Sequence, residues 1–335
     1  MRSAILFMIF NRPEQTALSF AQIRAARPPR LYVAADGPRD GREGEDRLCK
    51  AARQIAAAVD WPCEVKTLFR KRNLGCRLAC SSALSWFFEQ EAEGIVLEDD
   101  IEAHPDFFTF CDDLLERYRE VPKVSMISGF NYQMGRIRGD ASYYFSHHSH
   151  IWGWASWART WKGYDPTMAG YAHFLMNELP KRLGVNRLSL HYKSFFDSDM
   201  RDKTWDFALM YQNLRQGRLS VIPNYPLVNN IGFTTGIHFT ISTIWDLQRA
   251  SGLPGELRHP AASEACLDAA RFDVDLRHQG MRGLCLEAFR RAEAGETAAC
   301  LELLRMARAH HGADAAFDEI EAVARMRERL RADNA

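Results

Sequence analysis

The sequence has no long hydrophobic run near its start. The first apolar segment, AILFMIF, covers only residues 4–10 and is followed at once by Asn11, Arg12 and Pro13. A membrane-spanning helix needs about 20 predominantly apolar residues. We therefore expect neither a signal peptide core nor a transmembrane segment here, and we interpret the run as a buried first strand.

The sequence also lacks an excess of charge and any Cys-X-X-Cys pair. Forty-three basic residues balance 43 acidic residues, so the global charge does not indicate a nucleic acid or an anionic membrane as the partner. Eight cysteines are scattered through 335 residues, and a chain of this length does not depend on a disulfide framework. We expect reduced thiols and a cytoplasmic protein, with peripheral attachment to the inner membrane as an open alternative.

Nearly half of the residues, 47%, are hydrophobic, and in the first hundred positions they alternate between two patterns. Short apolar runs predict strands at residues 4–10, 30–37, 63–70 and 94–100. Apolar residues at helical spacing predict helices at 14–26, 45–59 and 76–90. This alternation is typical of an α/β protein whose mostly parallel sheet is flanked by helices and binds ligands at the carboxyl ends of its strands.

Later segments follow the pattern more loosely. Helices are predicted at residues 105–120 and 205–217, strands at 124–129 and 219–224, and an aromatic-rich loop at 143–164. Toward the end, LCLEAFRRAEAGETAACLELLRMARAHHGADAAFDEIEAVARMRERL predicts three consecutive amphipathic helices. We divide the chain into an α/β domain, residues 1–245, and a helical extension, residues 246–335, which is a candidate for homodimer formation.

Four polar clusters follow the predicted parallel strands and would share one edge of the sheet: NRP at 11–13, ADG at 35–37, RKRNLG at 70–75 and EDD at 98–100. Consecutive carboxylates repel one another unless water or a cation lies nearby. Mg²⁺ and Mn²⁺ prefer oxygen ligands and take only one or two from the protein when phosphates fill the other positions. The alternative is a solvated loop in which Asp99 or Asp100 caps the next helix.

As a set, several segments carry a resemblance: LFMIFNRP, LYVAADGPR, VKTLFRKRNLGCR, GIVLEDDI, HIWGWASW, TWDFAL and IPNYPLVNNIGF. They resemble the bacterial family 2-like glycosyltransferases of the GT-A fold, which are nucleotide-diphospho-sugar transferases. The LEDD segment is also similar to the metal motif of the N-acetylglucosaminyltransferase that begins complex N-glycan branching. The resemblance covers about residues 4–245.

The resemblance implies transfer of a sugar from a nucleotide donor, most often a UDP-sugar, with Mn²⁺ or Mg²⁺ as cofactor. It places the metal on Asp100, Asp99 toward the ribose or the metal, and Glu98 toward the donor sugar. The other residues expected to bind the nucleotide or its phosphates are Asn11, Arg12, Asp36, Arg72 and Asn73. Similar bacterial enzymes act on glycan, lipid-linked or protein acceptors, so cell-envelope or surface glycan synthesis is the expected setting.

An inverting transferase needs a carboxylate that takes the proton from the acceptor hydroxyl. The resemblance favours Asp206 in TWDFAL, and Asp197, Asp199 and Asp202 in the preceding acidic loop are the rivals. Asp206 also begins a predicted helix, where an acidic side chain would stabilise the helix dipole without any catalytic role.

Aromatic residues near these segments could stack on sugar rings. Trp152 and Trp154 flank Gly153, which lets the backbone approach a ligand closely, and Trp205 precedes the candidate base. We predict Trp154 near the donor and Trp152 and Trp205 near the acceptor or sugar, with packing in the core as the alternative for each ring.

Histidines offer two further candidates. His147, His148 and His150 have no cysteine or carboxylate at ligand spacing that would complete a tetrahedral zinc site. His238 is similar to a histidine that GT-A enzymes place near the metal or the diphosphate, although the loop around it lacks the acidic residues expected in relatives. A structural role for His238 therefore stays open.

Two other functions compete with glycosyl transfer. A nucleotidyltransferase would use a similar sheet and metal, but it typically has a glycine-rich basic loop after the first strand, and NRPEQT contains no glycine. A catalytically inactive sugar-nucleotide-binding or scaffold protein would not need Asp206 or the intact EDD. The sequence therefore predicts a metal-dependent, inverting glycosyltransferase.

Overall fold

A large mixed sheet organises the first of two compact units of the chain, which comprises Met1–Asn131, Arg138–Ile231 and Ala250–Leu267. The second unit consists mainly of Asp268–Ala335. In the computed structural model the described residues are 1–131, 137–183, 196, 202–232, 249–260, 288–289, 291–292, 294–311 and 315–332.

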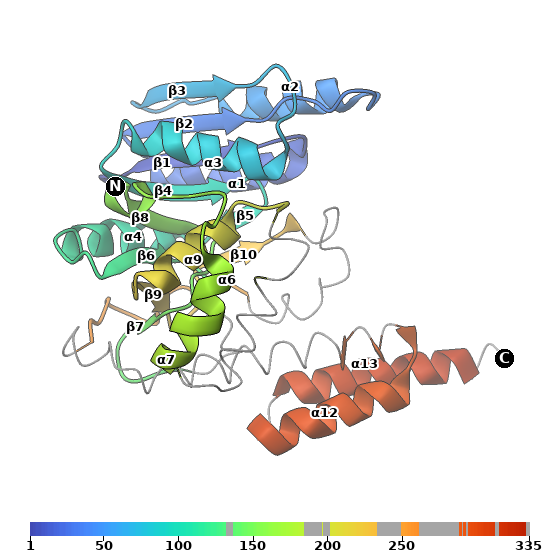
Figure 1. The fold of residues 1–335 in the computed structure, drawn as a ribbon. Coiled ribbons are helices and arrows are strands. Elements are labelled where there is room, and N and C mark those ends of the chain that lie inside the picture. Colours follow the sequence, from blue (N-terminus) through green and yellow to red (C-terminus); the bar gives the residue numbers. More distant parts are fainter. Residues whose placement is uncertain are drawn as a thin grey trace. The chain divides into compact units, whose positions relative to one another are not determined.

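Within the described residues the main sheet has eight strands in the order β3-β2-β1-β4-β8-β6-β9-β7. Their bounds are β1 Ala4–Ile9, β2 Arg30–Ala35, β3 Glu64–Phe69, β4 Glu93–Glu98, β6 Val124–Ser128, β7 Tyr143–Ser146, β8 Trp154–Trp157 and β9 Leu219–Pro223. Strands β1 to β4 pair in parallel, and so do β6 and β9, whereas β8 and β7 pair antiparallel with their neighbours. The predicted mostly parallel sheet flanked by helices is confirmed (Figure 1).

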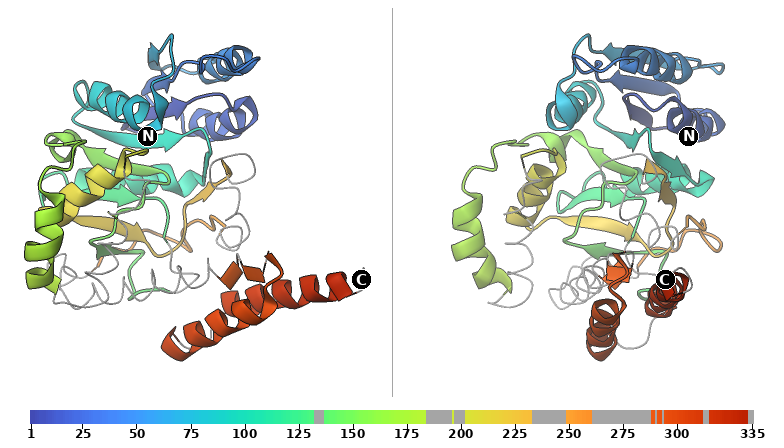
Figure 2. Two further views of the ribbon diagram at one scale, coloured as in Figure 1. Left: turned by 45° about the vertical axis from the view of Figure 1, so that its right-hand side comes forward. Right: turned by 90° about the vertical axis from the view of Figure 1, so that its right-hand side faces the viewer.

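The helices cover both faces of this sheet (Figure 2). In the first unit they are α1 Pro13–Ala26, α2 Glu45–Ala56, α3 Gly75–Phe88, α4 Pro105–Arg117, α5 Ala158–Trp161, α6 Tyr171–His173, the π-helix η1 Phe174–Glu178, α7 Leu179–Leu183 and α9 Asp206–Arg215. Helix α1 shows why the predicted bounds hold. Pro13 fits its first turn, and Arg27 ends it in the left-handed region with φ 49°.

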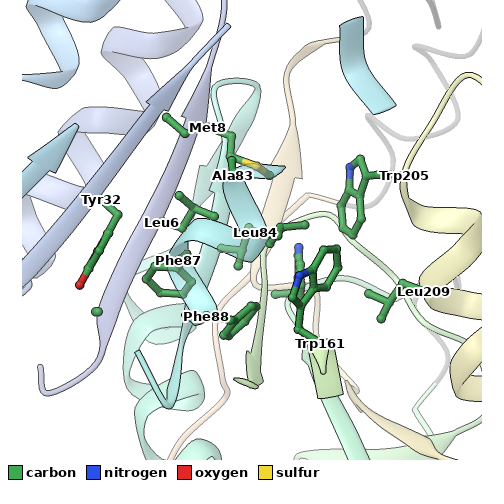
Figure 3. Close-up of a cluster of buried hydrophobic side chains, with 14 of the residues drawn as sticks. Leu6, Met8, Tyr32, Ala83, Leu84, Phe87, Phe88, Trp161, Trp205 and Leu209 are labelled. Carbon is green, nitrogen blue, oxygen red and sulfur yellow. The ribbon is translucent and has the colours of Figure 1, made fainter. Parts of the chain in front are cut away.

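Alternation along the strands assigns side chains to the two faces. On one face Leu6, Met8 and Tyr32 pack with α3, and Trp161, Trp205 and Leu209 complete the same cluster (Figure 3). On the other face Phe7 stacks on Phe20 of α1 with ring centroids 6.4 Å apart. Each such fully buried side chain contributes about 1.5–3 kcal/mol to stability, so both faces of the sheet are core.

The aromatic segment at residues 143–164 is the one clear correction to the predicted elements. It was expected to form a loop, but it contains strands β7 and β8 and the short helix α5. Tyr, Phe and Trp favour strands, and here they fill two antiparallel positions of the sheet, one of them between β4 and β6. A further two-stranded sheet pairs β5, Ile101–Ala103, with β10, Val228–Asn230.

The second unit contains two of the three predicted C-terminal helices, α12 Thr297–His311 and α13 Ala315–Ala332. They pack around a core of their own that includes Cys300, Leu304, Phe317 and Ile320. The predicted boundary at residue 245 lies outside the described residues. Within the part that is described, no helix has the length and apolar character needed to cross a membrane.

Candidate functional site

The carboxyl ends of β1, β2, β3 and β4 bring the four predicted polar clusters to one edge of the sheet. Because these strands are parallel, the residues that follow them share that edge. The backbone N–H of Asp36 donates to the carbonyl of Ile9 at 3.3 Å, and the N–H of Phe10 donates to the Asp99 carboxylate at 2.9 Å. The segments after β1, β2 and β4 are therefore in direct contact.

Arg12 joins the two aspartates of the acidic cluster. Its guanidinium lies 2.7 Å from Asp99 Oδ1 and 3.0 Å from Asp100 Oδ2. The Asp99 side chain is only 2% exposed, and its carbonyl oxygen accepts a hydrogen bond from Ser19 of α1 at 2.9 Å. Asp99 is thus fixed by β1, α1 and Arg12 together.

Burial shapes the protonation of this cluster. Burial raises the pKa of Asp99 to about 6, although Arg12 opposes that shift. Burial also raises the pKa of Glu98 well above its usual range, and the neighbouring charges of Asp100, Cys76 and Asp99 add to the effect. The pKa of Arg12 is raised, because attraction to Asp99 and Asp100 outweighs its own desolvation. The cluster therefore contains a strongly held cation, and burial disfavours the ionised forms of Glu98 and Asp99.

Asp100 is the member of the cluster best placed to hold a divalent cation. Its side chain is 17% exposed, whereas both oxygens of Asp99 already accept hydrogen bonds or pair with Arg12. Among the described residues no group of three or more His, Cys, Asp or Glu side chains is arranged to hold a metal. Asp100 with phosphate oxygens and water fits the modest protein contribution that Mg²⁺ requires.

Asp36 follows β2 at the same edge of the sheet and binds the start of α3. Its carboxylate accepts hydrogen bonds from the backbone N–H groups of Gly37, Leu74 and Gly75 at 2.8–3.1 Å, and from the Asn73 side chain at 2.9 Å. It therefore satisfies amides at the start of α3. The two predicted nucleotide contacts Asp36 and Asn73 are brought together, but they bind each other and the α3 terminus.

The backbone of Arg72 lies so close to position 37 that only glycine fits there. A Cβ on Gly37 would lie 2.4–2.6 Å from the backbone of Arg72, a distance that requires the backbone to shift. The Arg72 side chain is exposed. Gly37 therefore allows the segments after β2 and β3 to cross closely.

Asn11 contacts the start of α2 rather than the acidic cluster. Its side-chain amide donates to Glu45 at 2.9 Å. Glu45 is buried and also pairs with Arg39, and the hydrogen bonds from Arg39 lower the pKa of Glu45 to about 2. Sequence reasoning missed Glu45, although an acid in the first turn of a helix after the glycine-containing loop GREG offered a signal.

Asp206 is the first residue of α9 and is half-buried. Its negative charge opposes ionisation of the Cys76 thiol of α3, although the interaction with Cys80 lowers the pKa of Cys76 overall. Burial raises the pKa of Tyr164, and the charge of Asp206 adds to that shift. The rival Asp202 is an exposed residue whose carboxylate lies 3.9 Å from Arg77, and Asp197 and Asp199 lie outside the described residues. The charges of Asp100 and Asp36 also act on Cys76, so this thiol is within electrostatic range of all three aspartates.

Two of the three predicted sugar-stacking tryptophans belong to the core. Trp154 and Trp205 are 1% and 2% exposed, and their rings stack with centroids 5.7 Å apart. This is the packing role that the sequence left open for them. Trp152 is half-buried and lies against Phe130 with centroids 4.8 Å apart, so its ring is the one that retains an exposed part.

Gly153 lies beside β5, the strand that follows Asp100. Its φ of +55° is in the left-handed region, and an added Cβ would lie 2.8 Å from Val228 and 3.3 Å from Ile101. The backbone at Gly153 therefore closely approaches other parts of the protein, and its expected approach to a ligand stays a prediction. The backbone N–H of Ile231 donates to the Asp100 carbonyl at 2.8 Å, which joins β10 to the same corner.

The histidines give no metal centre among the described residues. The His147 ring contacts the Arg218 carbonyl at 3.0 Å, while His148 and His150 are buried. His238 lies outside the described residues, so its predicted place near the metal or diphosphate stays a prediction.

No family model matches the sequence, and a search of the curated proteins found no relative. Among solved structures, UDP-glucose pyrophosphorylase complexed with UDP-glucose is similar at a TM-score of 0.39 and 11% identity, covering 71% of this chain and 97% of that one. Mouse xyloside xylosyltransferase 1 in its apo form is similar at a TM-score of 0.32 and 9% identity, covering 77% and 96%. Both TM-scores are below 0.5, so the functional argument depends on the site itself.

Proposed function

We propose that the chain is a metal-dependent, inverting glycosyltransferase that moves a sugar from a nucleoside diphosphate donor, a UDP-sugar, to a hydroxyl acceptor. The observation that carries the proposal is the cluster of Arg12, Asp99 and Asp100 at the carboxyl edge of the parallel strands. It combines a cation suited to a diphosphate with a partly exposed carboxylate suited to a hard metal ion.

In this proposal Asp100 holds Mn²⁺ or Mg²⁺, and Asp99 fixes the direction of Arg12. A bound divalent cation would neutralise negative charge on the departing diphosphate. Arg12 is 26% exposed, so its guanidinium can contact a phosphate oxygen while keeping its ion pair with the buried Asp99. Glu98, whose neutral form burial favours, can donate a hydrogen bond to the donor sugar.

Asp206 is the proposed catalytic base. It begins α9, and its charge acts on Cys76 in the first turn of α3, as do the charges of Asp100 and Asp36. A carboxylate there can accept the proton of an acceptor hydroxyl as the new glycosidic bond forms. Trp152 supplies the partly exposed ring for a sugar, and the acceptor class, whether glycan, lipid-linked or protein, stays open.

The test is product analysis after incubation with a panel of nucleotide sugars, with and without Mn²⁺ or Mg²⁺. Glycosyl transfer or donor hydrolysis releases the nucleoside diphosphate in a metal-dependent way, and this is the result we expect. Pyrophosphate made from a nucleoside triphosphate and a sugar phosphate would indicate a nucleotidyltransferase instead. If neither product forms and UDP with Mn²⁺ gives no thermal stabilisation, the proposal is overturned in favour of a scaffold.

A further inference from the structure

Helix α3 carries two cysteines four residues apart, next to the candidate site. Cys76 lies in its first turn and Cys80 one turn later. Cys76 is exposed and Cys80 is half-buried, whereas Cys49, Cys111 and Cys300 are buried. Among the described cysteines these two alone stand one helical turn apart on the same helix, so they form the one local dithiol.

The two thiols interact with each other. A hydrogen bond between them lowers the pKa of Cys76 and, together with burial, raises that of Cys80. Cys80 also packs against the core cluster that contains Leu84 and Trp161, so its position is fixed. The exposed Cys76 therefore has a neighbouring thiol held in place beside it.

Helical spacing determines what this pair can bind. Side chains at positions i and i+4 have Cβ atoms about 5–6 Å apart, whereas a disulfide needs about 3.5–4.5 Å. A disulfide would therefore require the first turn of α3 to unwind. A bridging atom that forms two bonds of about 2.3 Å to sulfur, the length known for thiolate-metal bonds, spans the pair without that change.

The choice of bridging atom follows from ligand number and charge. Zinc requires four ligands, and no group of three potential ligands exists among the described residues. The charges of Asp206, Asp100 and Asp36 act on Cys76, and they disfavour an adduct with added negative charge, such as copper(I) between two thiolates. Trivalent arsenic bound by two sulfurs and one carbon is uncharged.

We propose that Cys76 and Cys80 form a dithiol site that captures trivalent arsenicals. With an organoarsenic(III) oxide, two sulfur-arsenic bonds form and the arsenic-oxygen bond breaks. The two thiol protons leave with that oxygen as one molecule of water, and no atom is oxidised or reduced. The adduct forms in the first turn of α3, directly after Leu74 and Gly75, whose backbone N–H groups donate to Asp36 at the sheet edge.

The test uses the full-length protein and phenylarsine oxide, followed by intact-mass spectrometry. We expect one adduct at low reagent concentration, with the mass of the reagent less one water, and its removal by excess 2,3-dimercaptopropanol. Cys76→Ser and Cys80→Ser should each need about 100-fold more reagent, because the advantage of two linked contacts is lost. Cys63→Ser is the matched control and should label like the wild-type protein.

Circular dichroism establishes that each variant is folded. The proposal would be overturned if Cys76→Ser and Cys80→Ser were both half-labelled at the same reagent concentration as the wild type. It would also be overturned by an adduct that 2,3-dimercaptopropanol does not remove. The mass measurement needs no enzymatic activity, so its outcome is independent of the proposed glycosyl transfer. Inhibition of donor turnover by the adduct would then place the site at the catalytic edge.

Discussion

Replacement of Asp36 tests whether this carboxylate serves the fold or the ligand. The resemblance predicts a contact with the nucleotide base, but the structure shows a carboxylate saturated by Gly37, Asn73, Leu74 and Gly75. We expect Asp36→Ala to destabilise the protein even when no nucleotide is present.

The magnitude follows from the donors left without an acceptor. Loss of a helix N-terminal acceptor costs about 1 kcal/mol. The N–H of Gly37 is buried with its residue, and an unsatisfied buried donor costs about 1–3 kcal/mol. We therefore expect a loss of about 3 kcal/mol for Asp36→Ala. Asp36→Asn retains one oxygen and should lose about half as much, following the same hydrogen-bond values.

Urea denaturation followed by tryptophan fluorescence measures this loss. The matched control is Asp40→Ala, which removes an exposed carboxylate from the same loop and should change stability by less than about 0.5 kcal/mol. A loss below about 1 kcal/mol for Asp36→Ala, combined with abolished UDP binding, would refute the structural role and support a ligand contact.

Three further predictions concern the acidic cluster and the base. Asp100→Ala should fold normally, because the side chain is partly exposed, but should lose metal-dependent donor turnover; full turnover in a coupled UDP assay would exclude the metal role. Asp206→Asn should bind the donor like the wild type but transfer the sugar at least about 100-fold more slowly. An unchanged single-turnover rate would exclude Asp206 as the catalytic base. The pKa of Asp99 is raised to about 6 from 3.8, so its native state binds the proton more tightly than the unfolded chain. Proton binding by Asp99 therefore contributes about 3 kcal/mol to the free energy of unfolding. This contribution is complete below about pH 4 and is lost as pH rises through about 6. An Asp99→Asn variant with the same pH dependence of urea denaturation as the wild type would contradict this.

The order of strands and helices in the first hundred residues could be read from the sequence. Polar or turn residues follow β1 to β4, and Pro13 marks the start of α1 between the first two strands. β7 and β8 were not predicted, because each has only four residues and lies in a continuous aromatic segment without clear alternation. β5 and β10 are three residues each, too short for any periodicity.

The meeting of the polar segments at one sheet edge followed from strand polarity, but the partners of their residues did not. Because parallel strands end at one edge, the meeting of the segments at 11–13 and 98–100 was predictable. The ion pair of Arg12 with Asp99 depends on how α1 leaves β1, which no local pattern encodes. The stacking of Trp154 on Trp205 depends equally on packing between segments distant in sequence.

The guanidinium between Asp99 and Asp100 has a consequence for handling the protein. Two carboxylates already share one permanent counter-ion, and burial favours the neutral form of Glu98. The corner therefore carries about one net negative charge before any ion binds, and Arg12 already relieves part of the repulsion between the two aspartates. Chelator-treated protein should remain natively folded, and any ion bound there should exchange freely with the medium.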